Sequence, residues 1–203
     1  VRVTASAPTR ERAEEMMAPV IERVKGMFGE LAYGMDAANL AEFTTKLMIE
    51  RGVTLATAES CTGGELAKAI TDIPGASAVL LGGVVVYTNE AKHRLLGVPE
   101  EILESKGAVS YEVAVELARR VRESMDSDLG VGITGLAGPD GDGVHEVGTV
   151  FISLADREHV WVREKHITHR ERAQVRLYAC QNAFDMIRRR LAGLPVEEIR
   201  VDP

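Results

Sequence analysis

Apolar residues are arranged in two different ways along the chain. In three short segments they continue without alternating with polar residues, which is typical of strands buried on both faces of a sheet. These segments are Val53–Ala58, Val79–Tyr87 and Leu129–Thr134. Two further segments, Gly148–Leu154 and Val160–Lys165, flank Asp156-Arg157 and predict a hairpin.

Between these strands, apolar residues recur at helical spacing. The clearest case follows Ser110, a good helix N-cap, and predicts a long helix. Its apolar stripe consists of Val113, Leu117, Val121 and Met125. We expect the other helices of this region at Glu65–Thr71, Asn89–Leu96, Pro99–Ser105 and from about Arg170 to Leu191. Strands that alternate with helices and end in a hairpin predict an α/β fold. The expected form is a three-layer αβα sandwich, with a mostly parallel sheet and an antiparallel edge hairpin.

The first part of the chain differs from this pattern and predicts a separate unit. It reads as a strand at Val1–Ala5, a helix that opens at Pro8-Thr9, and a hinge at Tyr33-Gly34. Asp36 then follows as the expected N-cap of the next helix. We therefore divide the chain into residues 1–35, a main domain at 36–195 and a C-terminal tail at 196–203. Because the chain starts at Val1 and not at Met, we expect a piece of a longer protein.

Composition excludes several functional classes. The 203 residues carry a formal net charge of −7, which disfavours a nucleic-acid surface. The two cysteines, Cys61 and Cys180, form no CxxC pair, so neither a zinc site nor a disulfide framework is expected. No apolar run reaches membrane-spanning length, and no signal peptide opens the chain. We expect a cytoplasmic protein without a membrane partner, a metal or a cofactor.

Polar clusters follow each of the first three predicted strands. They are Glu59–Gly64, Tyr87–Lys92 and Thr134–Pro139. In an open α/β sheet, ligands bind beyond the carboxyl ends of the strands, so the three clusters are expected to meet in one pocket. The glycines of the third cluster do not form a GxGxxG fingerprint, and no GxxxxGK[ST] motif occurs.

The first cluster contains two candidate nucleophiles, Ser60 and Cys61. The glycines that follow allow a ligand to approach the backbone, and the amides of the next helix can hold a phosphate or an oxyanion. The alternative interpretation is a helix cap followed by a glycine turn. The residues alone do not decide between the two nucleophiles.

A serine nucleophile needs a base, and Lys92 is the best candidate because it lies near the start of a helix at a strand end. The positive end of the helix and partial burial both lower the pKa of an amine there. Tyr87 is placed to orient it. From the residues alone, however, an exposed lysine on a helix surface is the favoured interpretation.

Several motifs together resemble one known family. They are Thr54-Leu55-Ala56-Thr57-Ala58-Glu59-Ser60-Cys61-Thr62-Gly63-Gly64, Pro74-Gly75-Ala76-Ser77, Gly82 to Lys92, Gly107-Ala108-Val109-Ser110, Thr134 to Pro139 and Val147-Gly148-Thr149-Val150. In this order and spacing they resemble the CinA C-terminal domain, also called PncC, over roughly residues 36–192. Residues 1–35 resemble the end of the KH-like linker domain of full-length CinA proteins.

The resemblance implies hydrolysis of nicotinamide mononucleotide to nicotinate mononucleotide and ammonia by a metal-free serine–lysine mechanism. It makes Ser60 the nucleophile and Lys92 its base, with Tyr87 and Thr134 in support. The implied substrate-binding residues are Cys61, Thr62, Gly63, Gly64, Asn89, Gly135, Gly138 and Arg170, with Arg176 as an alternative to Arg170. The expected partner is a small nucleotide substrate, and a homodimer is expected.

One segment departs from the family pattern. Asp140 to Glu146 is shorter and more acidic than the corresponding family loop, which affects the expected contacts to phosphate or ribose. Two alternatives therefore remain beside the deamidase. One is an amidase with another substrate, and the other is a non-catalytic interaction protein linked to competence or DNA damage.

Overall fold

The computed structural model describes residues 1–196 and 199–201 and divides into two compact units, Val1–Ala37 and Ala38–Pro203. Its helices are α1 (Arg10–Phe28), α2 (Leu40–Arg51), α3 (Glu65–Thr71), α4 (Asn89–Leu96), α5 (Glu100–Lys106), α6 (Tyr111–Met125) and α7 (Arg172–Ala192), with short 3₁₀ turns at Gly29–Leu31 and Ala76–Ala78. Its strands are β1 (Leu55–Glu59), β2 (Leu80–Val85), β3 (Leu129–Gly135), β4 (Thr149–Ala155), β5 (Val160–His166) and β6 (Ile199–Val201).

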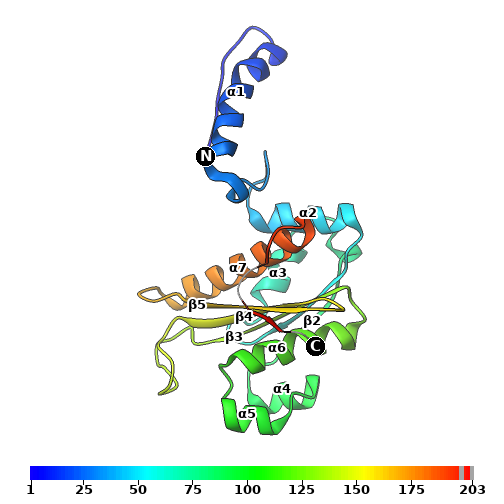
Figure 1. Ribbon diagram of the computed structural model, residues 1–203, viewed down its shortest axis with the longest axis vertical. Coiled ribbons are helices and arrows are strands. Elements are labelled where there is room, and N and C mark those ends of the chain that lie inside the picture. The colour runs from blue at the N-terminus through cyan, green and yellow to red at the C-terminus, as the bar shows by residue number, and fades with distance from the viewer. Residues whose placement is uncertain (197–198, 202–203) are drawn as a thin grey trace. The chain divides into compact units, whose positions relative to one another are not determined.

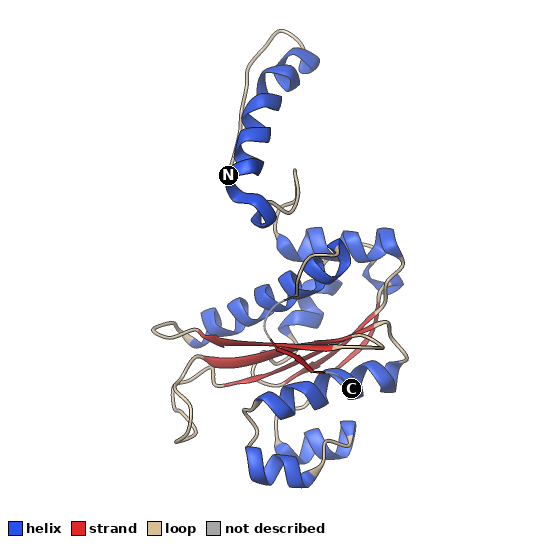
Figure 2. Cartoon of the chain, viewed as in Figure 1, coloured by secondary structure: helices blue, strands red, loops and turns tan. Residues whose placement is uncertain are grey.

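The second unit is a three-layer αβα sandwich, as predicted (Figures 1 and 2). Its sheet has the order β2-β1-β3-β4-β5-β6. β1 pairs in parallel with β2 and with β3, whereas β4, β5 and β6 each pair antiparallel to the preceding strand. The antiparallel part is thus larger than the predicted hairpin. β6 lies within the segment expected to be a tail, of which residues 197–198 and 202–203 lie outside the described part of the chain.

Helices cover both faces of this sheet (Figure 1). One face packs against α2, α3 and α7 through a cluster that includes Met48, Ile70 and Phe184. The other face packs against α6, and α4 and α5 pack in turn against α6, with Leu96, Leu103 and Leu117 in one apolar cluster. Leu55 of β1 belongs to the first cluster and Ala56 and Ala58 to the second, so the strand is buried on both faces, as its apolar run predicts.

α6 approaches β3 unusually closely because two glycines of the strand face it. A Cβ atom at Gly132 would lie 2.6 Å from the Ala114 carbonyl oxygen, and one at Gly130 would overlap the Ala118 carbonyl oxygen. These glycines therefore serve helix packing. The predicted cap of α6 is also present, since the Ser110 hydroxyl accepts the Val113 amide at 3.3 Å.

Three local predictions were wrong. Val1–Ala5 does not form a strand in the described chain, because it pairs with no other strand. The N-cap of α2 is Asn39, whose side chain accepts the Glu42 amide at 2.9 Å, whereas Asp36 has a φ of 59°. β2 is an edge strand whose residues alternate between half-buried and exposed, because only β1 flanks it.

The first unit contains α1, which begins after Thr9, whose hydroxyl accepts the Arg12 amide at 3.3 Å. None of the residues of α1 is buried. In the described part of the chain, no helix combines the length and the apolar character needed to cross a membrane.

Candidate active site

The carboxyl ends of β1, β2 and β3 bring the three predicted polar clusters together. Ser60 follows β1, and its amide donates to the Ile133 carbonyl of β3 at 2.9 Å. On the other side, the Val86 amide after β2 donates to the Glu59 carbonyl at 2.8 Å. Ser60 is therefore held between the ends of two neighbouring strands, as the position of a ligand site in an open α/β sheet predicts.

A tight turn leads from Ser60 into α3. Gly63 and Gly64 have φ angles of 62° and 92°, a region that other residues rarely adopt. The Gly63 amide donates to the Ser60 carbonyl at 3.0 Å and closes the turn. The Gly-Gly pair in the sequence thus has a conformational reason.

The free amides of this turn are not those predicted from the sequence. The Gly63 amide is used within the turn, and the Gly64 amide donates to the Glu59 carboxylate at 3.1 Å. Neither is available for an oxyanion or a phosphate. Within the described residues, neither the Cys61 amide nor the Thr62 amide donates to a backbone carbonyl of another residue, so these two are the candidate donors for a bound ligand.

Lys92 lies directly against Ser60. Its Nζ is 3.2 Å from Ser60 Oγ and 3.0 Å from the Val86 carbonyl oxygen. The residue is 1% exposed, so the interpretation as a surface lysine was wrong. Burial lowers the pKa of the Lys92 ammonium to about 8, and no carboxylate of the described residues forms an ion pair with it. A substantial fraction of neutral amine, able to accept a proton, is therefore present near neutral pH.

Cys61, the other candidate nucleophile, is in the opposite electrostatic situation. It is 5% exposed, and burial raises the pKa of its thiol to about 12. A thiol with such a pKa is almost entirely protonated at neutral pH and is a poor nucleophile. The surroundings therefore favour Ser60.

Thr134 and Tyr87 border the same region as the Ser60–Lys92 pair. Thr134 is buried at the end of β3, where its hydroxyl donates to the Ala108 carbonyl at 2.6 Å. Tyr87 is 55% exposed. In the described chain no hydrogen bond links either side chain to Ser60 or Lys92, so the structure places them as neighbours of the pair.

Two arginines of α7 reach this site. Arg172 donates to the Tyr87 hydroxyl at 2.7 Å and to the Gly138 carbonyl at 2.6 Å. Arg176 donates to the Thr62 carbonyl at 2.7 and 3.1 Å. They stand four residues apart on one helix face, a spacing that could have revealed the pair in the sequence.

Arg170, the arginine chosen from the sequence, lies elsewhere. Its guanidinium lies over the Tyr178 ring, 5.8 Å from the ring centroid. Arg170 precedes α7 and stacks on the helix, whereas Arg172 on the first turn points to the strand ends. Arg172 therefore lies where Arg170 was expected, and Arg176, the alternative to Arg170 in the sequence analysis, also reaches the site.

Two further residues predicted to bind the substrate, Asn89 and Gly135, lie at the border of the site. Asn89 is the first residue of α4 and is exposed. Gly135 ends β3, where a Cβ atom would lie 2.7 Å from the Thr149 carbonyl oxygen. This close approach to β4 explains the glycine without a ligand.

Comparison with known proteins identifies the family. Residues 37–191 match the family described as the CinA C-terminal domain. This chain belongs to the CinA family. It is 48% identical, over 97% of its length, to a CinA-like protein of Desulfovibrio desulfuricans, and 44% identical, over 97%, to a putative competence-damage inducible protein of Caldanaerobacter subterraneus. It spans 47% and 48% of these two relatives, so about half of their length.

Solved structures of the CinA superfamily share the fold. A competence/damage inducible protein from Agrobacterium tumefaciens is 35% identical, with a TM-score of 0.70 over 75% of this chain and 97% of that one. A CinA superfamily protein from Klebsiella pneumoniae is 30% identical, with a TM-score of 0.72 over 76% of this chain and 96% of that one. These likenesses support the α/β fold of the CinA C-terminal domain.

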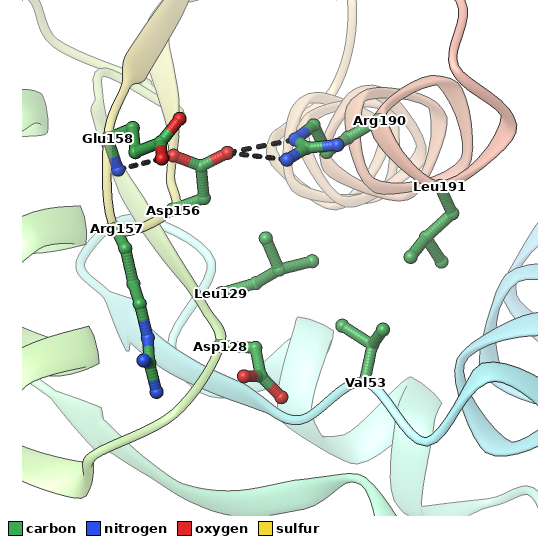
Figure 3. Close-up of a pocket in the computed structure, with 8 residues that line it drawn as sticks. All are labelled: Val53, Asp128, Leu129, Asp156, Arg157, Glu158, Arg190 and Leu191. Atoms are coloured by element: carbon green, nitrogen blue, oxygen red, sulfur yellow. Dashed lines mark hydrogen bonds and ion pairs between the residues drawn. The ribbon is translucent and has the colours of Figure 1, made fainter.

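A cavity of about 330 Å³ in this CinA domain lies away from the Ser60–Lys92 pair. It is lined by Val53, Asp128, Leu129, Asp156, Arg157, Glu158, Arg190 and Leu191 (Figure 3). These residues come from the amino ends of β1 and β3, the β4–β5 turn and the end of α7. Arg190 is paired with Asp156 at 2.9 Å, and the cavity contains none of the predicted site residues.

Proposed function

We propose that this CinA-family chain hydrolyses the carboxamide of nicotinamide mononucleotide, giving nicotinate mononucleotide and ammonia. The observation that carries the proposal is the buried Lys92 Nζ, 3.2 Å from Ser60 Oγ. Such a pair supplies a nucleophile and its base without a histidine. The substrate itself is suggested by the family resemblance of the motifs around Ser60, Lys92 and Thr134.

The proposed reaction begins with proton transfer from the Ser60 hydroxyl to neutral Lys92. Ser60 Oγ attacks the carboxamide carbon, and the resulting oxyanion is held by the Cys61 and Thr62 amides. The tetrahedral intermediate breaks its C–N bond as the Lys92 ammonium returns the proton to the leaving nitrogen, releasing ammonia. Water, deprotonated by Lys92, then cleaves the acyl-enzyme ester, which releases nicotinate mononucleotide and restores Ser60.

The arginines of α7 lie where they can bind the part of the substrate that carries the phosphate. Arg172 carries positive charge to the edge of the site, where a 5′-phosphate is a suitable partner, whereas Arg176 beside it is paired with Glu65 at 3.4 Å. The Tyr87 hydroxyl and the Gly138 carbonyl now hold Arg172, and we propose that the phosphate takes over this guanidinium when substrate binds. Thr134 supports the site indirectly through the Ala108 carbonyl.

Ammonia release from nicotinamide mononucleotide tests the proposal. We expect the purified protein to release ammonia, and Ser60→Ala to lose at least about a thousandfold of that activity because the nucleophile is removed. Cys61→Ala is the matched control and is expected to retain activity. A folded protein that releases no ammonia contradicts the substrate, and a fully active Ser60→Ala variant contradicts the mechanism.

A second candidate is an amidase with a different substrate, favoured by the departing loop. Asp142 accepts the Val144 and His145 amides at 2.9 and 2.7 Å and pairs with the His145 ring at 3.0 Å. The side chains that the loop from Asp140 to Glu146 offers to a substrate therefore differ from those of the family loop. Testing other primary amides separates the candidates, and a protein inert on all of them favours the non-catalytic interaction role. The expected homodimer stays a prediction, for analytical ultracentrifugation to test.

A further inference from the structure

The carboxylate of Glu59 lies immediately before the candidate nucleophile and is almost completely buried, at 1% exposure. Its oxygens accept three backbone amides, those of Gly64 at 3.1 Å, Leu66 at 3.0 Å and Ala67 at 2.9 Å. We propose that Glu59 is a positioning residue that fixes the turn carrying Ser60. The inference rests on the proposed function in one respect, that Ser60 is the nucleophile.

Glu59 replaces the usual cap of α3. The N-cap position of this helix is Gly64, which has no side chain to accept the orphan amides of the first turn. Glu59 accepts them from the preceding strand, so one side chain joins the end of β1 to the start of α3. The residues between these two points, Ser60 to Gly63, are thereby enclosed in a loop tied at both ends.

This arrangement determines which amides remain free. Because Glu59 engages the Gly64 amide and the first turn of α3, a ligand cannot use them. The unengaged donors are the amides of Cys61 and Thr62, directly after the nucleophile. Loss of the Glu59 clamp would release the turn and let Ser60 and these two donors move relative to Lys92.

Because the Glu59 carboxylate is buried, the hydrogen bonds that it accepts must be well formed. Burying a carboxylate is costly unless hydrogen bonds satisfy it, and three charge-assisted bonds from amides at a helix start do so. A glutamine in this place is nearly isosteric, but its amide nitrogen would face a backbone N–H that Glu59 now accepts. Glu59→Gln therefore disturbs the clamp while changing the volume little.

Asp128 offers a matched control at the other end of β1. Its carboxylate accepts the amide and the hydroxyl of Thr54 at 2.9 and 2.8 Å. Asp128→Asn thus also weakens a carboxylate–backbone contact next to β1, far from Ser60. Any effect of general destabilisation will appear in both variants.

The test measures the rate at which a fluorophosphonate labels Ser60, because this probe reports serine reactivity without nicotinamide mononucleotide. We expect Glu59→Gln to slow labelling by about tenfold to a hundredfold, the scale of effect that a displacement of about 1 Å produces. In the deamidase assay kcat should fall by a similar factor, with KM within about threefold. Asp128→Asn should leave the labelling rate within about twofold.

The outcomes separate this inference from the proposed function. Normal labelling of the wild type without ammonia release overturns the substrate but not the role of Glu59. A folded Glu59→Gln variant that labels at the wild-type rate overturns the positioning role, as does an equal slowing in Asp128→Asn. If Glu59→Gln does not fold, Glu59→Asp carries the test: it keeps the charge but is too short to reach all three amides, and unchanged labelling overturns the inference.

Discussion

A lysine amine can act as a base only when it is neutral, and at Lys92 burial supplies that condition. The side chain is enclosed by the ends of β1, β2 and α4, and its Nζ contacts the Ser60 hydroxyl and the Val86 carbonyl. Neither contact stabilises the ammonium as a carboxylate would. Desolvation therefore outweighs the smaller, opposing effect of Cys61, and the pKa of Lys92 falls to about 8.

This pKa predicts the pH dependence of the reaction. Below about pH 8 Lys92 is increasingly protonated, so kcat/KM should fall toward tenfold per pH unit on the acid side and level off above about pH 9. A pH profile of kcat/KM from 5.5 to 9.5 measures this limb. Lys92→Arg, which stays protonated throughout, should be inactive at every pH, and a flat wild-type profile would contradict a lysine base.

For single residues, the sequence was enough to predict most side chains of the site, but not what surrounds them in the fold. Ser60 and Lys92 were found from their positions after strands, yet burial of Lys92 depends on α4 folding back over the strand ends, which no local pattern encodes. No sequence pattern indicates the role of Glu59, because that role consists of contacts to three backbone amides. Arg170 was expected at the site because the last helix was predicted to start there, but α7 starts two positions later, enough to turn a side chain to another face. Arg176, the alternative to Arg170, does reach the site.

At the scale of elements, the backbone of α6 packs directly against glycines of β3. A Cβ atom at Gly132 would lie 2.6 Å from both the Ala114 carbonyl oxygen and the Ala118 amide nitrogen, which are fixed parts of the helix. We expect Gly132→Ala to lower the free energy of unfolding by about 1–3 kcal/mol through overpacking. Urea denaturation measures the change.

Gly82 of β2 provides the control for this substitution. A Cβ atom there would meet the sulfur of Met125 at 3.1 Å, the far part of a flexible side chain that can move aside. Gly82→Ala should therefore cost clearly less than Gly132→Ala. Equal losses would show that strand glycines matter here for a reason other than contact with the α6 backbone.

α7 carries the positive charge of the site on its first two turns. Arg172→Ala removes a guanidinium proposed to bind the substrate phosphate, so we expect KM for nicotinamide mononucleotide to rise at least about tenfold, with a smaller change in kcat. Steady-state kinetics measure both. Arg170→Ala is the control, because Arg170 stacks on Tyr178, and it should change KM by less than about twofold.

Helices and strands with a clear apolar period could be predicted from the sequence. Strands whose burial or pairing depends on the neighbouring strands could not. α3, α4 and α6 were placed within a residue or two because caps and glycines mark their ends. β2 was expected to be buried, since its apolar composition does not show that it lies at the sheet edge. β6 pairs with β5 through only three residues, too few for their alternation to predict a strand, so only the folded sheet reveals it.

At the scale of the whole molecule, every residue of the candidate site lies in the unit Ala38–Pro203, and so do the apolar clusters that hold its sheet. The unit Val1–Ala37 contributes α1, whose residues are all outside a core. We therefore expect a chain starting at Ala38 to fold and to keep kcat/KM within about twofold of the full 203 residues. Circular dichroism and the ammonia assay measure the two properties. A folded but inactive shortened chain would mean that the reaction depends on residues before Ala38, and the site would then have to be redrawn to include them.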